Sequence, residues 1–353
     1  MAISPFNYAV RRWYIKKFQW EYWPMWVVYL PVSFYYIYLA IKAKSLFFFS
    51  AANPGIETGG AFFESKWKIF QLIPSAYYPK TIYITAHETL DKVQEALDAA
   101  SINFPVIAKP DRGERGWLVQ KISNIGELTA YLNKVNIPFL IQEYVDYPLE
   151  FSIFYYRHPS SNKGILTSIT FKKLLTLTGD GHSTIEELIL QNDRSFLQFQ
   201  RLKELNTIDF SSVLQKGEEQ VIVPYGNHVL GAMFLDYNHI IDEQLNNTFD
   251  TISNQIEGFY FGRFDLRCTS IEDLKQGKNI AILELNGVGA EPAHIYQPGF
   301  SFFKAEKVIA QHYKMMYEAA IYLKEKGLNY MTHAEFKEWR KKEKEYKLKA
   351  IKP

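Results

Sequence analysis

Two short segments, Gly-Arg-Phe-Asp ending at Asp265 and Glu-Leu-Asn-Gly beginning at Glu284, place polar side chains among apolar neighbours. In a β-strand, residues two apart point to the same face, so Arg263 shares a face with Asp265. Glu284 and Asn286 do the same in the second strand. If the strands pair, the four side chains converge on a site whose oxygen ligands suit Mg²⁺, which bridges substrate phosphates. Arg263 would then neutralise a phosphoryl oxygen. The alternative is the exposed face of a polar hairpin.

A basic loop with two glycines follows the apolar segment at residues 104–108. Lys109 stands at the end of that segment. The loop after it carries Arg112, Gly113, Arg115 and Gly116. Glycines let the backbone approach a phosphate closely, and cations offset the phosphate charge. The pattern indicates a phosphate-binding loop, although a basic surface turn has the same composition.

Residues 138–145 are typical of a strand that continues into a short extended segment. Such a segment offers backbone N–H and C=O groups to a flat heterocycle. Glu143 is placed to accept from an exocyclic amine, and Glu150 to accept from ribose hydroxyls. Taken singly, these glutamates are more often solvated surface charges.

In this order the three segments resemble the ATP-grasp superfamily, over roughly residues 60–300. The resemblance is nearest to the D-alanine–D-alanine ligases and to the ATP-grasp part of cyanophycin synthetases. It implies ATP and Mg²⁺ as cofactors, with phosphate contacts from Arg263 and Lys109. The metal ligands it implies are Asp265, Glu284 and Asn286. The further ATP contacts it implies are Lys66, Glu143, Tyr144, Val145 and Glu150.

The stretch at residues 178–188 is similar to a loop near the active site of cyanophycin-type members. This similarity makes Lys172, Lys173 and His182 candidates for phosphate or substrate contact. For His182, the alternative is a turn residue that hydrogen-bonds locally.

The segment after Asn286 supplies candidates for handling a second substrate. Glu291 and His294 are candidates for binding or deprotonating an amine, and the alternative is a structural turn. Backbone N–H groups of residues 287–289, together with Arg263, are expected to stabilise an oxyanion.

The expected activity is that of a carboxylate–amine ligase, which forms a C–N bond through an acyl phosphate. Its substrates would be small-molecule or lipid-linked carboxylates and amines. Two alternatives remain: an ATP-grasp kinase that phosphorylates a hydroxyl, and a non-catalytic, membrane-bound nucleotide-binding module. The acyl donor, the amine acceptor and the oligomeric state stay open.

Residues 8–44 form an aromatic segment, and residues 13–49 hold fifteen aromatic side chains. Residues 23–41 carry no charge, and as a helix they would be roughly 28 Å long, close to the hydrocarbon core of a bilayer. Pro31, several tyrosines and cations at both ends argue against a span. We expect one or two helices lying in the membrane interface, or a shallow re-entrant hairpin, on the inner face of the cytoplasmic membrane. A buried core helix and a true span are the alternatives.

Composition excludes several classes of protein. The single Cys268 rules out an intrachain disulfide framework and a multi-cysteine metal site. The net charge of +2 and the absence of a basic, aromatic-rich platform give no indication of nucleic-acid binding.

Strand-like and helix-like segments alternate along the chain, which predicts an α+β fold, and the resemblance implies two α+β subdomains that clasp ATP. The first of these segments, an apolar run at 45–52, is expected to be a buried strand. The expected divisions are a membrane-associated segment at 1–44, a short α/β subdomain at 45–80, a lid subdomain at 81–150, a central and C-terminal subdomain at 151–330, and a basic helix at 331–353.

Overall fold

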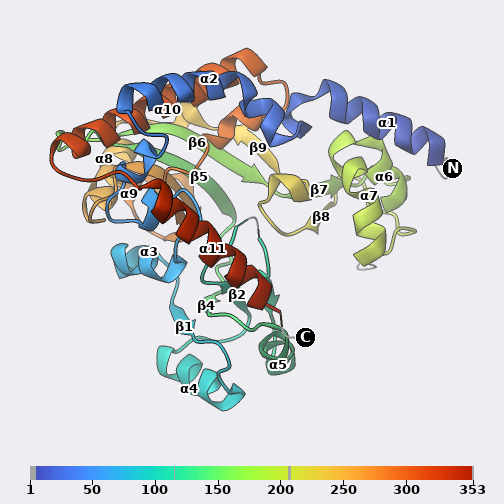
Figure 1. Cartoon of the computed structure of the whole chain (residues 1–353). Helices are drawn as coiled ribbons and strands as arrows, with labels where there is room; N and C mark the ends of the chain where they lie inside the picture. The colour runs from blue at the N-terminus through green and yellow to red at the C-terminus, as the bar shows by residue number, and fades with distance from the viewer. Residues whose placement is uncertain (1–4, 115, 206–207, 352–353) are drawn as a thin grey trace.

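The computed structural model describes residues 5–114, 116–205 and 208–351. Helices and mostly antiparallel strands are interleaved along the chain, which confirms the predicted α+β class. Two separate sheets form the two main bodies, as the resemblance implied (Figure 1).

The smaller body is a four-stranded antiparallel sheet in the order β1-β4-β2-β3 with two helices. Its elements are β1 (Thr81–Ile84), α4 (Leu90–Ala100), β2 (Val106–Pro110), β3 (Gln120–Ile122), α5 (Ile125–Lys134) and β4 (Phe139–Glu143). The helices are amphipathic, and Val93, Leu97 and Leu128 are buried against the sheet. We call this body the small sheet.

The larger body is a five-stranded sheet in the order β11-β10-β5-β6-β9, which we call the central sheet. Its strands are β5 (Leu149–Tyr156), β6 (Ile165–Lys173), β9 (Met233–Asp236), β10 (Phe261–Cys268) and β11 (Ile280–Asn286). Alternate residues of β5 face opposite sides: Ile153 and Tyr155 lie in one core cluster, and Phe154 and Tyr156 lie in another.

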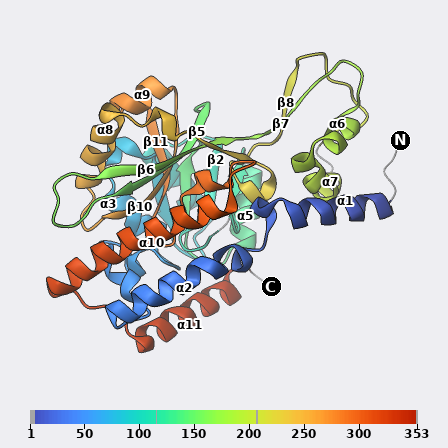
Figure 2. The ribbon, with the colours of Figure 1, turned by 90° about the horizontal axis from the view of Figure 1, so that it is seen from above.

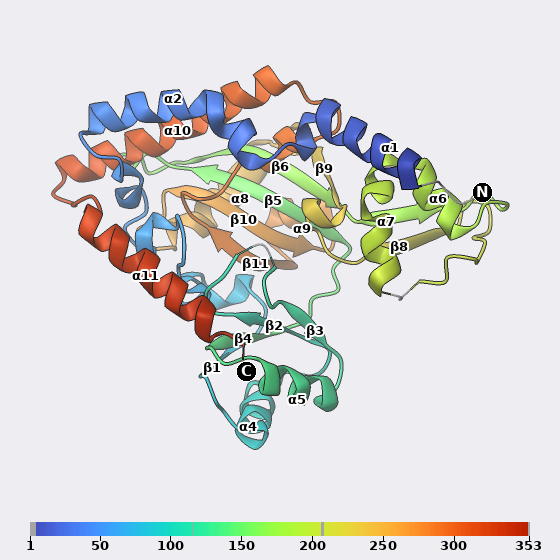
Figure 3. The ribbon, with the colours of Figure 1, turned by 45° about the vertical axis from the view of Figure 1, so that its right-hand side comes forward.

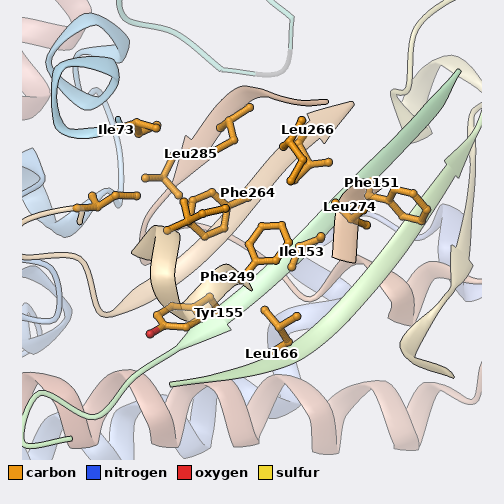
Figure 4. Close-up of a cluster of buried hydrophobic side chains, with 14 of the residues drawn as sticks. Ile73, Phe151, Ile153, Tyr155, Leu166, Phe249, Phe264, Leu266, Leu274 and Leu285 are labelled. Atoms are coloured by element: carbon orange, nitrogen blue, oxygen red, sulfur yellow. The ribbon is translucent and has the colours of Figure 1, made fainter. Parts of the chain in front are cut away.

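Helices cover both faces of the central sheet. The first cluster is completed by α3 (Lys66–Leu72), α8 (Glu243–Asn254) and α9 (Ile271–Gln276), and Figure 4 shows its side chains. The opposite face is covered by the long α10 (Phe302–Glu325), through Met316, Ala319 and Ala320. The polar residues of β10 and β11 are therefore held on a rigid, double-sided core.

The N-terminal segment forms α1 (Pro5–Phe18) and α2 (Met25–Ala43), joined by a 3₁₀ turn, Trp20–Tyr22. The inner face of α2 packs on α10, where Leu39 and Ala40 are buried. Figures 1 and 3 show α1 and α2 following one another along one edge of the molecule. Within the described residues, α2 is the one helix long and apolar enough to cross a membrane by length and composition.

The expected strand at 45–52 is wrong. Residues Phe48–Ala51 form a 3₁₀ helix, with Phe48 and Ala51 buried in the cluster beneath α10. A short apolar run has the same sequence pattern in a buried strand and in a buried turn of helix, so periodicity alone does not separate them. The described part of residues 45–80 contains 3₁₀ turns at Glu57–Gly59 and Ser75–Tyr77 together with α3, and it contains no strand.

A small lobe projects from the central sheet beside α1 (Figure 2). It contains β7 (Leu175–Thr178), α6 (Ile185–Gln191), α7 (Asp193–Leu205) and β8 (Glu219–Val223). Tyr8 and Ile15 of α1 are buried in its core. Outside that core, the buried Arg194 pairs with Glu21, which follows α1. The lobe therefore holds α1 by both apolar and ionic contacts.

The C-terminal helix α11 (His333–Lys349) begins at a capping box formed by Thr332 and Glu335. It lies across the boundary between the two bodies (Figures 1 and 3). Near its start, Phe336 stacks on Phe47 at 5.0 Å. Near its end, the Tyr346 hydroxyl donates to the carbonyl of Pro138, and Ala350 is buried in the small-sheet core.

Candidate functional site

Strands β10 and β11 pair as the sequence predicted. Arg263 lies opposite Asn286, and Asp265 lies opposite Glu284. Directly opposite residues of an antiparallel pair point to the same face, so the four polar groups form one cluster. The register shifts after Asp265, which leaves Leu283 as a bulged residue.

The Asp265 carboxylate is the most heavily bonded group of this cluster. The Arg263 guanidinium donates to both of its oxygens, at 3.0 and 2.9 Å, and Lys172 Nζ lies 3.3 Å away. Asn286 Nδ2 donates to it at 3.2 Å, and Ser152 Oγ also donates. Burial by itself raises the pKa of Asp265, but Arg263 and Lys172 outweigh that effect and hold its pKa well below the usual range. The carboxylate is therefore anionic at all physiological pH values.

Lys109 is buried at the end of β2 and faces the bulge of β11. Its Nζ donates to Gln142 Oε1 at 2.9 Å and to the Leu283 carbonyl at 3.0 Å. Burial lowers the pKa of Lys109 to about 7, and the charge of Glu284 only partly offsets that effect. A buried amine that is easily reprotonated suits an anionic ligand.

Lys66, at the start of α3, reaches the same region. Its Nζ lies 3.6 Å from Glu284 Oε1 and donates to the Gly113 carbonyl. A small pocket here is lined by Glu64, Lys66, Ile69, Phe70, Glu284 and Leu285. Ser65 caps α3 by accepting from the Lys68 N–H, which fixes the helix start that carries Lys66. The structure therefore brings Lys66, Lys109 and Glu284 together.

Glu150, at the start of β5, forms the other end of the cluster. Its carboxylate pairs with Arg267 at 3.1 Å and with Lys172 at 3.4 Å. Arg267 also donates to the Val145 carbonyl at 3.0 Å. Lys172 thus bridges Glu150 and Asp265, and Arg267 connects the expected ATP contact Val145 to the same network.

The basic loop is only partly directed to this site. Arg112 pairs with Glu57 at 2.8 Å and lies between the rings of Phe63 and Trp339. Gly113 adopts a φ of +144° and supplies the carbonyl bonded by Lys66. Gly116 has a φ of +75° with open space where a side chain would be. Arg115 lies outside the described residues.

Four other expected site residues show no contact with this network among the described residues. Glu143 ends β4, and Lys121 lies over the Tyr144 ring at 3.8 Å. Lys173 is exposed at the end of β6. The backbone N–H of His182 donates to Asp180 in an exposed turn of the small lobe.

The expected oxyanion site at residues 287–289 needs correction. The N–H of Val288 donates to the Gly59 carbonyl, and the N–H of Gly289 donates to the Gly60 carbonyl. Gly60, at a φ of +78°, lies so close that a Cβ there would be 2.6 Å from the Gly287 Cα. These two N–H groups therefore hold a backbone contact between two loops and are already paired.

His294 is buried and hydrogen-bonded to Ser168 Oγ at 2.6 Å. Burial lowers the pKa of His294, and the charge of Asp236 only partly opposes the shift. Glu291, in contrast, is part of the Arg263 contacts, because its backbone carbonyl accepts from Arg263 at 3.0 Å.

Donor chemistry decides whether a metal ion fits. Asp265 and Glu284 provide carboxylate oxygens, and Asn286 provides a carbonyl oxygen that remains after its amide has donated to Asp265. Oxygen ligands on one face of two paired strands match the preference of Mg²⁺. The described residues contain no group of three or more His, Cys, Asp or Glu side chains positioned for a metal ion. These three oxygen donors therefore suit a Mg²⁺ ion that keeps some of its bound waters and also binds oxygens of the substrate.

Three residues of the network were not predicted from the sequence: Ser152, Gln142 and Arg267. Arg267 was open to prediction, because it follows Asp265 by two positions on the same strand and so shares its face. Ser152 and Gln142 reach the site from strands distant in sequence, and no local signal marks them.

No protein-family model matches the sequence, and comparison with curated proteins finds no match. Among solved structures, the chain is similar to a bifunctional glutathione synthetase from Pasteurella multocida, with 16% identity, 70% of this chain and 36% of that chain covered, and a TM-score of 0.40. It is also similar to the VanG D-Ala:D-Ser ligase from Enterococcus faecalis, with 13% identity, 76% and 64% covered, and a TM-score of 0.40. A third is a D-alanine–D-alanine ligase from Bacillus anthracis, with 14% identity, 76% and 71% covered, and a TM-score of 0.40.

Each of these structures is named as a ligase or a synthetase. This chain spans about a third of the first and just under two thirds of the second. Its activity and substrates are therefore argued from its own residues.

Proposed function

We propose that this protein is an ATP-dependent carboxylate–amine ligase that works through an acyl phosphate. The observation that carries the proposal is the convergence of Asp265, Glu284 and Asn286 on paired strands, with Arg263 within the same cluster. Lys109 approaches Glu284 from β2 of the small sheet, and Lys66 approaches it from α3. Cations around a carboxylate and carboxamide group suit a nucleotide triphosphate and its metal ion.

The proposed reaction has two displacements. A substrate carboxylate oxygen attacks the γ-phosphorus of ATP and ADP leaves, which gives an acyl phosphate. The nitrogen of an amine then attacks the acyl carbon, inorganic phosphate leaves, and the amine loses a proton. In this proposal Lys109 and Lys66 contact phosphate, and Arg263 stabilises negative charge on the transferring group, which is consistent with their positions beside Leu283, Glu284 and Asp265.

Mg²⁺ would be held by Asp265, Glu284 and Asn286, and when bound it neutralises phosphate charge. Lys172 sits between Asp265 and Glu150, and its positive charge offsets the repulsion between these two carboxylates. Arg267 orients Glu150 and the Val145 carbonyl, the groups proposed to contact ribose and adenine.

The proposed location is the membrane surface. Large side chains stand exposed along α2: Trp26, Leu30, Phe34, Ile37, Tyr38 and Ile41. On α1 the exposed ones are Phe6, Val10, Trp13, Tyr14 and Phe18. We call these two sets the aromatic face. Neither helix contains an acidic residue, and lysines or arginines occur in or beside both. Apolar side chains next to cations favour the interface of an anionic bilayer.

The position of α2 supports a monotopic arrangement. Its inner face packs along α10, a helix that carries charged side chains such as Lys314 and Glu318. A bilayer-spanning α2 would draw α10 into the hydrocarbon region, where charges are costly. On this basis we propose a peripheral, in-plane α2 and a substrate that is membrane-linked or amphiphilic.

The test uses Glu284→Gln, which removes one anionic ligand. Glu284 is the better choice because its side chain is 38% exposed, whereas Asp265→Asn would also leave Arg263 and Lys172 without their carboxylate. Turnover should fall by about 100-fold or more, measured as phosphate release from ATP with a panel of carboxylates and amines.

The matched control is Glu338→Gln, an exposed acidic residue on α11. Both variants should keep the wild-type circular dichroism spectrum and thermal midpoint. Phosphate release by Glu284→Gln at the rate of the control would reject the assignment.

A further inference from the structure

A second acidic residue, Glu291, is connected to the Asp265 cluster through the guanidinium group of Arg263. Arg263 contacts the Asp265 carboxylate through Nε and Nη2, and it contacts the Glu291 backbone through Nη1. The Glu291 side chain turns toward the edge formed by α2. Its Oε2 accepts from the Tyr296 hydroxyl at 2.6 Å.

Tyr29 of α2 completes this group, because its hydroxyl is hydrogen-bonded to Glu291 and to Tyr296. The Tyr296 ring packs against Trp20 at 5.6 Å, and both tyrosines belong to the apolar cluster between α2 and α10. Glu291, Tyr29 and Tyr296 are called the Glu291 cluster. This cluster connects α2 to strands β10 and β11, which carry the proposed metal ligands.

The electrostatics of Glu291 differ from those of the neighbouring carboxylates. Asp265, Glu150 and Glu284 each have a lysine or arginine nitrogen within 4.0 Å. Among the described residues no lysine or arginine nitrogen forms such an ion pair with Glu291, although the charge of Arg263 acts on its carboxylate from a greater distance. Its side-chain hydrogen bonds are with tyrosine hydroxyls. A partly buried carboxylate that has hydroxyl donors but no cation in direct contact can accept an ammonium group from a ligand.

We propose that the Glu291 cluster binds the primary ammonium group of the amine acceptor, with Glu291 as the binding carboxylate and Tyr29 and Tyr296 as positioning residues. The proposal rests on the ligase function proposed above and assigns its second substrate site. Because Tyr29 comes from α2, the helix that carries much of the aromatic face also forms part of the active site. His294 is not a member of this cluster, and its Nδ1 is hydrogen-bonded to Ser168.

Zero-length crosslinking tests the site without turnover. A water-soluble carbodiimide activates carboxylates, and a bound amine then attacks the activated carboxyl carbon, which forms an amide and releases the urea. The full-length protein is treated with phosphatidylethanolamine in phosphatidylcholine vesicles in one arm, and with soluble ethanolamine in the other. Mass spectrometry measures amide formation at Glu291 relative to the exposed Glu338.

We expect preferential labelling of Glu291, and Tyr29→Phe should reduce it by about tenfold, the usual effect of losing a hydrogen bond to a charged group. Tyr36→Phe is the matched control, because that hydroxyl of α2 donates to the Leu46 carbonyl instead. Tyr296→Phe provides a second variant if Tyr29→Phe proves unstable. Higher labelling from vesicles assigns a lipid-borne amine, and equal labelling in both arms assigns a free one.

Labelling of Glu291 no greater than that of Glu338 in both arms overturns the proposal. So does unchanged labelling in both the Tyr29→Phe and Tyr296→Phe variants. These outcomes are separate from failure of the ligase function, which is measured by phosphate release from the Glu284→Gln variant.

Discussion

Lys109 is the residue at which ligand binding and protonation are most closely linked. Its pKa of about 7 reflects burial, whereas the ordinary value in an unfolded chain is 10.5. A triphosphate placed beside Nζ favours the charged amine and raises that pKa. Above pH 7 the free protein therefore holds a neutral Lys109, and ATP binding must take up a proton.

This linkage predicts that ATP affinity falls as the pH rises from 7 toward 9, with proton uptake on binding. Calorimetry in two buffers of different ionisation enthalpy measures the uptake directly. Lys109→Met should abolish the uptake and weaken ATP binding. The exposed Lys92→Met is the control. Equal uptake in both variants would show that Lys109 does not face the nucleotide.

At this scale, sequence reasoning succeeded where strand alternation applied. The convergence of Arg263, Asp265, Glu284 and Asn286 followed from a period of two, provided that the two strands paired, and the structure adds their register. Glu291 was a candidate from the sequence, but its contact with Tyr29 could not be predicted, because α2 and the loop after β11 are far apart in the chain.

Helix α11 acts as a link between the two bodies. It contacts the 45–63 region through Phe336 and Trp339, and it contacts the small sheet through Tyr346. Phe336→Ala should lower the free energy of unfolding by about 1–2 kcal/mol, less than for a fully buried ring. It should also increase hydrogen exchange in residues 333–351.

Lys337→Ala, an exposed change on the same helix, should alter neither the exchange nor the stability. Chemical denaturation supplies the free energies for both variants. If Phe336→Ala leaves hydrogen exchange at the C-terminal end of α11 unchanged, the contact at Phe336 does not stabilise the end of the helix that packs on the small sheet.

The small lobe is attached to α1 through a buried ion pair. The Arg194 guanidinium pairs with the Glu21 carboxylate and donates to the Ala232 carbonyl. His228 Nε2 lies 3.3 Å from the same Glu21 carboxylate. Removing one partner of a buried pair leaves an uncompensated charge, so Arg194→Ala should cost about 3–5 kcal/mol. Lys203→Ala breaks an exposed pair with Glu186 and should cost at most about 1 kcal/mol. Urea unfolding compares the two, and equal costs would contradict the burial argument.

At the scale of helices and strands, the elements that depend on local sequence could be predicted, and those that depend on distant contacts could not. Helix α5 can be found from the sequence alone, because its N-cap Asn124 and its apolar spacing both lie in the local sequence. The 3₁₀ turn at Phe48–Ala51 was mistaken for a strand, since only contact with α10 decides its geometry. The paired strands β7 and β8 were not predicted, because they lie about forty residues apart and pair outside both main sheets.

On the scale of the whole molecule, the aromatic face lies along one edge, and Trp26, Phe34 and Ile41 are 72%, 68% and 71% exposed. Deleting residues 1–44 is a poor test of its role. Such a deletion would uncover the α10 cluster around Leu39 and the lobe core around Ile15. Substitutions on the outer side leave these cores intact.

Trp26→Glu and Phe34→Glu should each reduce binding to anionic vesicles by about tenfold or more, because a buried apolar side chain contributes about 1.5–3 kcal/mol. Val119→Glu, an exposed apolar position in the small-sheet body, is the control. Flotation with vesicles measures binding. Equal flotation of the three variants would remove the aromatic face from the membrane proposal.

Depth measurements separate an in-plane α2 from a spanning one. Cys268 is buried, so cysteines introduced at positions 26, 34 and 41 can be spin-labelled selectively. If α2 lies in the interface, the three labels report similar, shallow depths. If α2 spans the bilayer, the label at position 34 lies near the centre and the other two lie near opposite surfaces, because residues 26 and 41 are about 22 Å apart along a helix. The packing of α2 on α10 leads us to expect equal depths, and with them an active site that opens beside the lipid headgroups.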